Sequence, residues 1–234
     1  MEKKPEPEPP KETKTPEPPK ETKTPEPPKE TKTPEPPKEP EPRAKETSGI
    51  LLFNEYDLSE VVIRDTGLGR YINLDPVIIP HTGGRHADKQ FGRAKTNIIE
   101  RLINNMMRTG SYTGKKNKSY AVVRKALKII QERTKTNPVQ IFVEALENAA
   151  PREEITRLRF GGINVPRAVD ISPSRRLDVA LRNICRGAVA ASHKNRKSAE
   201  QCLADEIMLA SKGDMNSFAV SKRDEAERVA ASAR

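Results

Sequence analysis

The chain of 234 residues contains 43 Lys and Arg against 33 Asp and Glu, which gives a formal net charge of +10, and it has only two cysteines. Because residues 1–42 carry nine lysines and eleven glutamates, the remaining 192 residues have a net charge of +12, which is typical of a protein that binds a polyanion such as nucleic acid. No apolar run is long enough to span a bilayer, no apolar stretch follows the first lysines, and two cysteines make no disulfide framework, so we expect a soluble, unexported, cytoplasmic protein.

The N-terminal tail repeats the nonapeptide PEPPKETKT three times, at residues 7–15, 16–24 and 25–33, and a fourth copy starts at Pro34. Repeats without large apolar side chains cannot build a core, so we predict that residues 1–48 form a disordered, proline-rich tail. Nine residues are three turns of a polyproline II helix, so each copy can present the same face. The tail is therefore either a solvated spacer, which we favour, or a docking motif for a proline-reading groove.

Residues 49–97 predict an irregular arm with short extended pieces at residues 61–63 and 77–79 between glycines and prolines. The end of this arm is basic and contains a single acid, Asp88. Its cationic and imidazole side chains are Arg85, His86, Lys89, Arg93 and Lys95.

The spacing of apolar residues predicts a helical domain over residues 98–234. Apolar residues recur at the i, i+3, i+4 spacing from Ile98 to Met107, and Gly110 ends this first helix. Five more helices are expected, and their starts are marked by Ser119, by Asn137-Pro138, by Ser172-Pro173, by the capping box of Ser198 and Gln201, and by about Lys222. The fold class is therefore mainly α, a bundle of about six helices.

Two loops of this domain concentrate positive charge. Between Ser111 and Ile130 there is no acid at all, which is unusual for a merely solvated face. The cations before the second helix are Lys115, Lys116 and Lys118, and those after the fourth are Lys194, Arg196 and Lys197.

One stretch interrupts the helices. Apolar residues alternate with polar ones up to Phe160, the pattern breaks at Gly161-Gly162, and it resumes to Ile171, so residues 152–171 predict a protruding β-hairpin. Residues 150–176 contain no lysine but six arginines, Arg152, Arg157, Arg159, Arg167, Arg175 and Arg176. A guanidinium matches phosphate bidentately and stacks on bases. Because an isolated two-stranded ribbon is marginal in water, this one needs a scaffold or a ligand; the alternative to RNA binding is a surface hairpin with solvated arginines.

Catalytic and metal-binding patterns are not supported. The segment GSYTGKK (residues 110–116) lacks the glycine spacing and the hydroxyl of a phosphate-binding loop, and it lies between two helices. His81 and His86 have no further zinc ligands nearby, and the adjacent Glu153 and Glu154 point to opposite faces of a strand. We therefore expect no enzyme, no metal, no cofactor and no small-molecule substrate.

Three classes of function remain before any resemblance is considered: an RNA-binding structural protein, a helix-turn-helix DNA binder and an RNA-modifying enzyme. A helix-turn-helix protein places its basic residues along one recognition helix. Here the basic residues are dispersed over an arm, two loops and a ribbon, which suits a folded RNA recognised by shape from several sides.

The order of the motifs NIIERLINNMM, GKK, NPVQIFVEALENAAPRE, TRLRFGG, VDISPSRR, ALRNI, CLADEI and KRDEAERVA resembles the universal ribosomal protein family numbered seven in the bacterial small subunit and five in eukaryotes. The phrase INLDPVIIPHTGGRHADKQFGRA is most similar to the archaeal form. The resemblance runs from about Leu52 to Arg234 and leaves out the proline repeats.

This resemblance implies a protein that binds the 3′ major domain of small-subunit rRNA, nucleates assembly of the subunit head and contacts neighbouring head and platform proteins. It implies that the hairpin reaches the exit site, near tRNA and mRNA, through Arg157, Arg159, Phe160, Gly161, Gly162 and Arg167. The expected rRNA-binding residues are Arg85, His86, Lys89, Arg93, Lys95, Lys115, Lys116, Lys118, Arg152, Arg175, Arg176, Lys194, Arg196 and Lys197.

The sequence departs from the bacterial pattern at the hairpin, where Leu158 and Phe160 stand near the tip and arginines are fewer. Phe160 either stacks on a base or packs against the protein body. The aromatic C-terminal extension of bacterial members is also absent, so any contact made by that extension is not expected here.

Overall fold

The computed structural model describes residues 49–234 apart from Thr109, so the predicted tail, residues 1–48, lies outside the described residues. The side chains of Ser111 and Phe160 also lie outside it. Within this part of the chain the elements are α1 (Thr66–Gly69), the 3-10 turns η1 (Arg85–Asp88) and η2 (Gly92–Lys95), α2 (Ile98–Met106), η3 (Gly110–Tyr112), α3 (Lys116–Thr134), α4 (Pro138–Ala149), β1 (Glu153–Phe160), β2 (Ile163–Asp170), α5 (Pro173–Ser192), α6 (Ala199–Ser211) and α7 (Phe218–Ala231).

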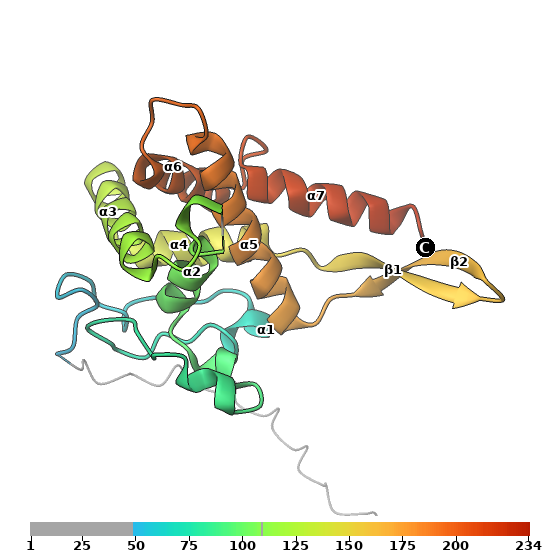
Figure 1. Ribbon diagram of the computed structural model, residues 1–234, viewed down its shortest axis with the longest axis horizontal. Coiled ribbons are helices and arrows are strands. Elements are labelled where there is room, and N and C mark those ends of the chain that lie inside the picture. Colours follow the sequence, from blue (N-terminus) through green and yellow to red (C-terminus); the bar gives the residue numbers. More distant parts are fainter. Residues whose placement is uncertain (1–48, 109) are drawn as a thin grey trace, which may run out of the picture. The chain divides into compact units, whose positions relative to one another are not determined.

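The predicted mainly α fold with one hairpin is confirmed: residues 49–234 form six helices of nine residues or more, one short helix and a two-stranded antiparallel sheet (Figure 1). Helix α6 packs against α3, α4 and α5, and α7 packs on α5 and on β1. The apolar faces of these helices meet in one core, in which Phe142, Leu127 and Ile103 are completely buried.

Local capping explains where the helices begin. The predicted capping box is present, with Ser198 accepting from the Gln201 backbone N–H and the Gln201 side chain accepting from Ser198 N–H. Helix α3 begins at Lys116, three residues before Ser119, because the turn at Gly114 (φ +71°) ends immediately ahead of it. Helix α7 begins at Phe218 rather than near Lys222, because Ser217 caps it by accepting from Val220 N–H.

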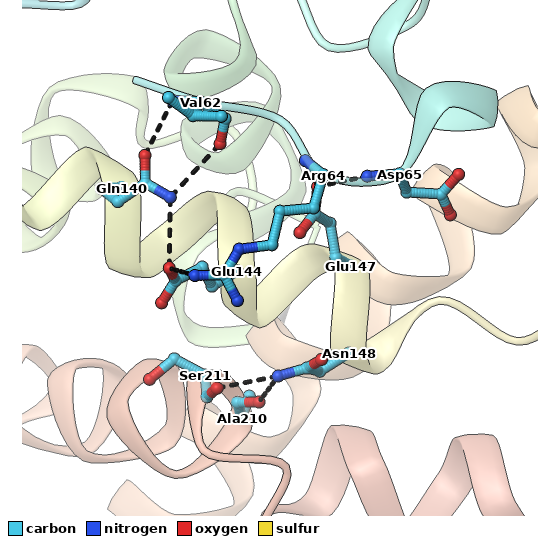
Figure 2. A network of polar contacts seen from close by, with 9 residues as sticks. All are labelled: Val62, Arg64, Asp65, Gln140, Glu144, Glu147, Asn148, Ala210 and Ser211. Carbon is cyan, nitrogen blue, oxygen red and sulfur yellow. Dashed lines mark hydrogen bonds and ion pairs between the residues drawn. The ribbon is translucent and has the colours of Figure 1, made fainter. Parts of the chain in front are cut away.

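The arm of residues 49–97 shares the core of the helices through the buried side chains of Leu52, Leu58 and Leu68. Figure 2 shows how polar groups of α4 hold the arm's backbone. The side-chain amide of Gln140 accepts from the Val62 N–H at 2.9 Å and donates to the Val62 carbonyl at 3.2 Å, as a neighbouring strand would. Further along α4, Glu147 accepts from the backbone N–H groups of two consecutive arm residues, Arg64 and Asp65.

The same view includes Asn148, which joins α4 to α6 by donating to the carbonyls of Ala210 and Ser211 at the end of α6 (Figure 2). An unpaired buried carbonyl at a helix C-terminus is costly, so this amide supplies donors that the helix itself lacks. The arm, α4 and α6 are therefore joined by hydrogen bonds as well as by the core.

No helix among the described residues is both long enough and apolar enough to cross a membrane. Cys185 and Cys202 are free and buried. Burial raises the pKa of the Cys185 thiol to about 12, so this cysteine acts as an apolar core side chain at neutral pH.

Candidate nucleic-acid interface

The hairpin turns through Gly161 (φ +54°) and Gly162 (φ +87°). Two consecutive positive φ angles define a type I′ turn, whose twist matches the paired strands and which favours glycine. The strands pair in register from Glu153 opposite Asp170 to Phe160 opposite Ile163. The turn explains why the predicted break in the alternation falls at these two glycines.

The pairing sorts the hairpin side chains onto two faces, because cross-strand partners share a face and successive residues of one strand point to opposite faces. Near the tip, one face carries Arg157 and Arg159, and Arg159 donates from Nε to the Asn164 side chain at 3.3 Å. The other face carries Leu158 and Val165 together with Arg167 nearer the base. Neither Arg157 nor Arg167 has an ion-pair partner within the described residues.

The tip is more exposed than the alternating pattern predicted. Ile163 is 70% exposed and Val165 is 43% exposed, whereas a half-buried strand would cover one face. The reason is that the contacts of the sheet to the helices involve α7, which reaches only the base of the hairpin. The scaffold that a two-stranded ribbon requires is thus supplied at one end, and the tip extends beyond it (Figure 1).

Ion pairs to both faces fix the base of the hairpin. On one face Glu153 pairs with Arg234, next to a hydrogen bond from Ala168 N–H to the Ala233 carbonyl. On the other face Glu154 pairs with Arg175 of α5 at 2.6 Å. The base is therefore held between the end of α7 and the start of α5.

Arg176, one of the predicted rRNA-binding residues, is directed inward. Its side chain is 13% exposed, and its guanidinium bonds Asp65 at 2.9 Å and donates from Nε to the Pro151 carbonyl. Burial alone would raise the pKa of Asp65, but the Gly67 N–H and Arg176 outweigh it and hold the pKa below its ordinary value. Arg176 is therefore paired within the protein, whereas Arg152 and Arg175 expose their side chains near the hairpin base.

The predicted basic segment at the end of the arm forms one loop around η1 and η2. Arg85, Lys89 and Lys95 are exposed, and none has a partner for its charge within the described residues. Arg93 is 54% exposed and bonds Asp178 of α5 at 2.9 Å, while His86 is partly buried with its Nδ1 3.3 Å from the Thr82 hydroxyl.

The lysines before and at the start of α3 differ in their surroundings. Lys116 bonds the buried carboxylate of Glu100 at 2.9 Å, and the same oxygen accepts from the Thr82 backbone N–H. Burial would raise the pKa of Glu100, but these two donors outweigh it and lower the pKa. Lys118 lies over the Tyr112 ring, with its Nζ 5.0 Å from the ring centroid. Lys115 is exposed, and its backbone N–H donates to the Tyr112 carbonyl at 3.0 Å.

The third basic loop follows α5. Lys194 and Arg196 are exposed, and Lys194 adopts a positive φ of 53°. Lys197 bonds Asp205 of α6 at 3.1 Å, and Asp205 also binds Arg133 at 2.5 Å. Lys194 and Arg196 therefore have the freer charges in this loop.

The structure adds a cationic groove that the sequence did not identify. It lies between the end of α2 and α5, has a volume of about 780 Å³, and contains no acid in its lining. Its charged and imidazole side chains are Arg108, Arg182, Arg186 and His193. The three arginines have no ion-pair partner in the described part of the chain. We call Arg108, Arg182 and Arg186 the groove cations.

The sequence indicates one side of the groove but not the other. Arg182 and Arg186 are four residues apart, so they share a face of α5 opposite its apolar stripe. That Arg108 lies across from them depends on how α2 packs on α5, which the spacing does not reveal. The neighbouring Arg101 looks equally basic in the sequence, but it is 4% exposed and bonds Asp178 at 2.7 Å and the Tyr71 carbonyl at 3.1 Å.

Together, the exposed cations form a surface suited to a polyanion. They come from the arm loop, the start of α3, the hairpin, the loop after α5 and the groove, rather than from one helix, so the arrangement disfavours a single recognition helix. Among residues 49–234 without Thr109, no group of His, Cys, Asp or Glu is placed to hold a metal ion.

Comparison with known proteins gives a consistent result. Residues 68–234 match the family described as ribosomal protein S7p/S5e. The chain is 56% identical over 186 residues to small ribosomal subunit protein uS7 of Methanococcus aeolicus, an alignment that covers 79% of this chain and 99% of the relative. The protein of the same name from Picrophilus torridus is 55% identical over 184 residues, covering 79% and 98%, and that from Thermoplasma volcanium is 54% identical over 184 residues, covering 79% and 100%.

Proposed function

Because this chain belongs to the ribosomal protein S7p/S5e family, of archaeal type, we propose that it is a structural component of the small ribosomal subunit that binds the 3′ major domain of the subunit's rRNA. Such a protein contributes no catalytic chemistry; its function is to hold RNA in a fixed arrangement. In this proposal it works in the cytoplasm as part of the ribosome, nucleates assembly of the subunit head and contacts neighbouring head and platform proteins.

The observation that carries the proposal is the dispersal of exposed arginines and lysines over five separate segments of one helical body. Each cation that meets a phosphate releases counterions, and a folded RNA is recognised through many such contacts from several sides. The arm loop, Lys115 to Lys118, Lys194, Arg196 and the groove cations would anchor rRNA.

The hairpin has a different role in this proposal. Its base is fixed by helices and its tip is not, so the tip can reach a ligand beyond the anchoring surface. We infer that Arg157, Arg159 and Arg167 contact tRNA and mRNA at the exit site, with Gly161 and Gly162 keeping the turn narrow. The role of the Phe160 ring stays a prediction.

The test of rRNA binding is a titration of the full chain with a transcript of the 3′ major domain at several salt concentrations. We expect the affinity to fall steeply with salt, since several phosphates are neutralised at once. An affinity that does not change with salt would reject the proposal, because phosphate contacts would then contribute little to binding. Equal binding to any duplex DNA would reject it as well and would favour the alternative of a helix-turn-helix type DNA binder.

The test of the hairpin role replaces Arg157, Arg159 and Arg167 by alanine in one variant. Incorporation into the small subunit should be retained, because the anchoring cations are untouched, while crosslinking to tRNA at the exit site should drop. A matched variant carries alanine at Arg85, Lys89 and Lys95; it should incorporate less well, while the crosslinking per incorporated protein should stay unchanged. Equal loss of both properties in the hairpin variant would show that the hairpin is itself an anchor.

A further inference from the structure

Phe91 is a large apolar side chain in an unusual position. Phe91 is 80% exposed, the largest exposed fraction among the large apolar residues of the described part of the chain. Its backbone adopts φ +56°, in the left-handed region that bulky residues rarely occupy. A strained residue held in place by its surroundings is a reason to look for a function.

Close packing and hydrogen bonds fix the backbone of the loop around Phe91. Gly92 packs so closely that a Cβ on it would lie 2.3 Å from the His86 carbonyl oxygen, which brings η2 against η1. Two residues that follow Phe91 in the chain are also held: the Lys95 carbonyl accepts from the Asn73 side chain at 2.6 Å, and Arg93 bonds Asp178 of α5. The two 3-10 turns therefore hold the Phe91 backbone between fixed points while its ring extends into solvent.

Cationic residues flank Phe91 in the sequence. Arg85, Lys89 and Lys95 are exposed without partners for their charges within the described residues, and Arg93 is half exposed beside them, against the single acid Asp88. Covering this segment with an apolar protein groove would strip water from these cations without neutralising them, which is costly. An RNA strand can neutralise them through its phosphates and offer the flat face of a base to the ring.

We propose that Phe91 stacks on an unpaired base of the RNA to which the arm loop binds. The base must be unpaired because bases within an A-form helix are stacked on one another and are not open to a ring. The inference rests on the proposed rRNA binding and adds to it a contact that depends on an exposed base and not on phosphate alone.

The absence of tryptophan from the chain gives a direct test, since Phe91→Trp introduces a single tryptophan. In the full chain, titrated with the transcript of the 3′ major domain, Phe91→Trp should bind within about twofold of the wild type and its emission should be quenched by the stacked base. Met215→Trp is the control, because Met215 is 61% exposed in the turn beside Asp214 and away from the arm loop. Its emission should stay unchanged.

Two further variants separate stacking from apolar contact. Phe91→Ala removes the ring, and Phe91→Leu keeps an apolar side chain without an aromatic face. Both should lower the affinity by roughly 5-fold to 100-fold, the range expected for loss of one stacked base, while thermal unfolding should be unchanged because the ring is exposed.

The outcomes distinguish the inference from the proposed function. Salt-dependent binding combined with unquenched Phe91→Trp emission, or wild-type affinity of Phe91→Ala, would overturn stacking and leave rRNA binding in place; the ring would then face a protein neighbour. Failure of the wild-type chain to bind the transcript would overturn both.

Discussion

The groove cations offer a quantitative prediction, because Arg182 and Arg186 are exposed, unpaired within the described residues and absent from the core. Replacing both by alanine removes two phosphate contacts. Each contact contributes about 0.7–0.9 to the slope of log K against log salt, so the double variant should lose about 1.4–1.8 from that slope. If the electrostatic contribution vanishes near about 1 M salt, this corresponds to roughly a twentyfold loss of affinity in about 0.15 M salt.

The assay is filter binding of the 3′ major domain transcript at four or more salt concentrations. The control is Arg64→Ala with Arg133→Ala, which removes the same charge but from arginines already paired with Glu144 and Asp205. The free energy of unfolding of the groove variant should stay within about 0.5 kcal/mol of the wild type, since neither arginine is buried. A slope equal to that of the control variant would refute the assignment of the groove to RNA.

Two predictions concern the scaffold. Gly187→Ala should lower the free energy of unfolding by about 1–2 kcal/mol, because the new Cβ would lie 2.8 Å from the Phe218 Cβ. The cost of this overlap should exceed the gain in helix propensity of about 1 kcal/mol. A variant that is more stable in denaturant unfolding would show that α7 moves away easily. Glu100→Gln should cost about 1–3 kcal/mol near neutral pH by weakening the bond to Lys116. Because the folded pKa of Glu100 lies below its ordinary value of 4.5, its stabilisation is present above that value and is lost as the pH falls through the folded pKa. The wild type should therefore lose stability on acidification more steeply than Glu100→Gln, and parallel pH profiles would contradict this account.

Features decided over short stretches of sequence were predictable. The glycine pair set the hairpin turn, and Ser198 with Gln201 marked the start of α6, because the groups that interact are at most a few residues apart. The charged stretch from Lys222 predicts a start of α7 that is four residues too late, because the cap at Ser217 determines where the helix begins.

The sequence could not show which cations are free. Lys116 and Arg176 look as basic as Arg196, but their partners lie 16 and 111 residues away. Glu100 reaches Lys116 only because α2 packs on α3, and Asp65 reaches Arg176 only because the arm packs on α5. The groove was missed for a related reason, since Arg108 lies near Arg182 only through the packing of α2 on α5. A count of basic residues thus locates an interface roughly, and tertiary packing decides which members remain available.

The buried carboxylate of Glu206 on α6 accepts from the Ser217 hydroxyl at 2.7 Å and from the Ala219 N–H at 2.9 Å, so α6 secures the first turn of α7. The far end of α7 in turn holds Glu153 of the hairpin through Arg234. The direction in which the hairpin points is consequently encoded outside its own strands. Grafting residues 152–171 onto another scaffold would transfer the turn and its arginines but not the orientation that α6 and α7 give them.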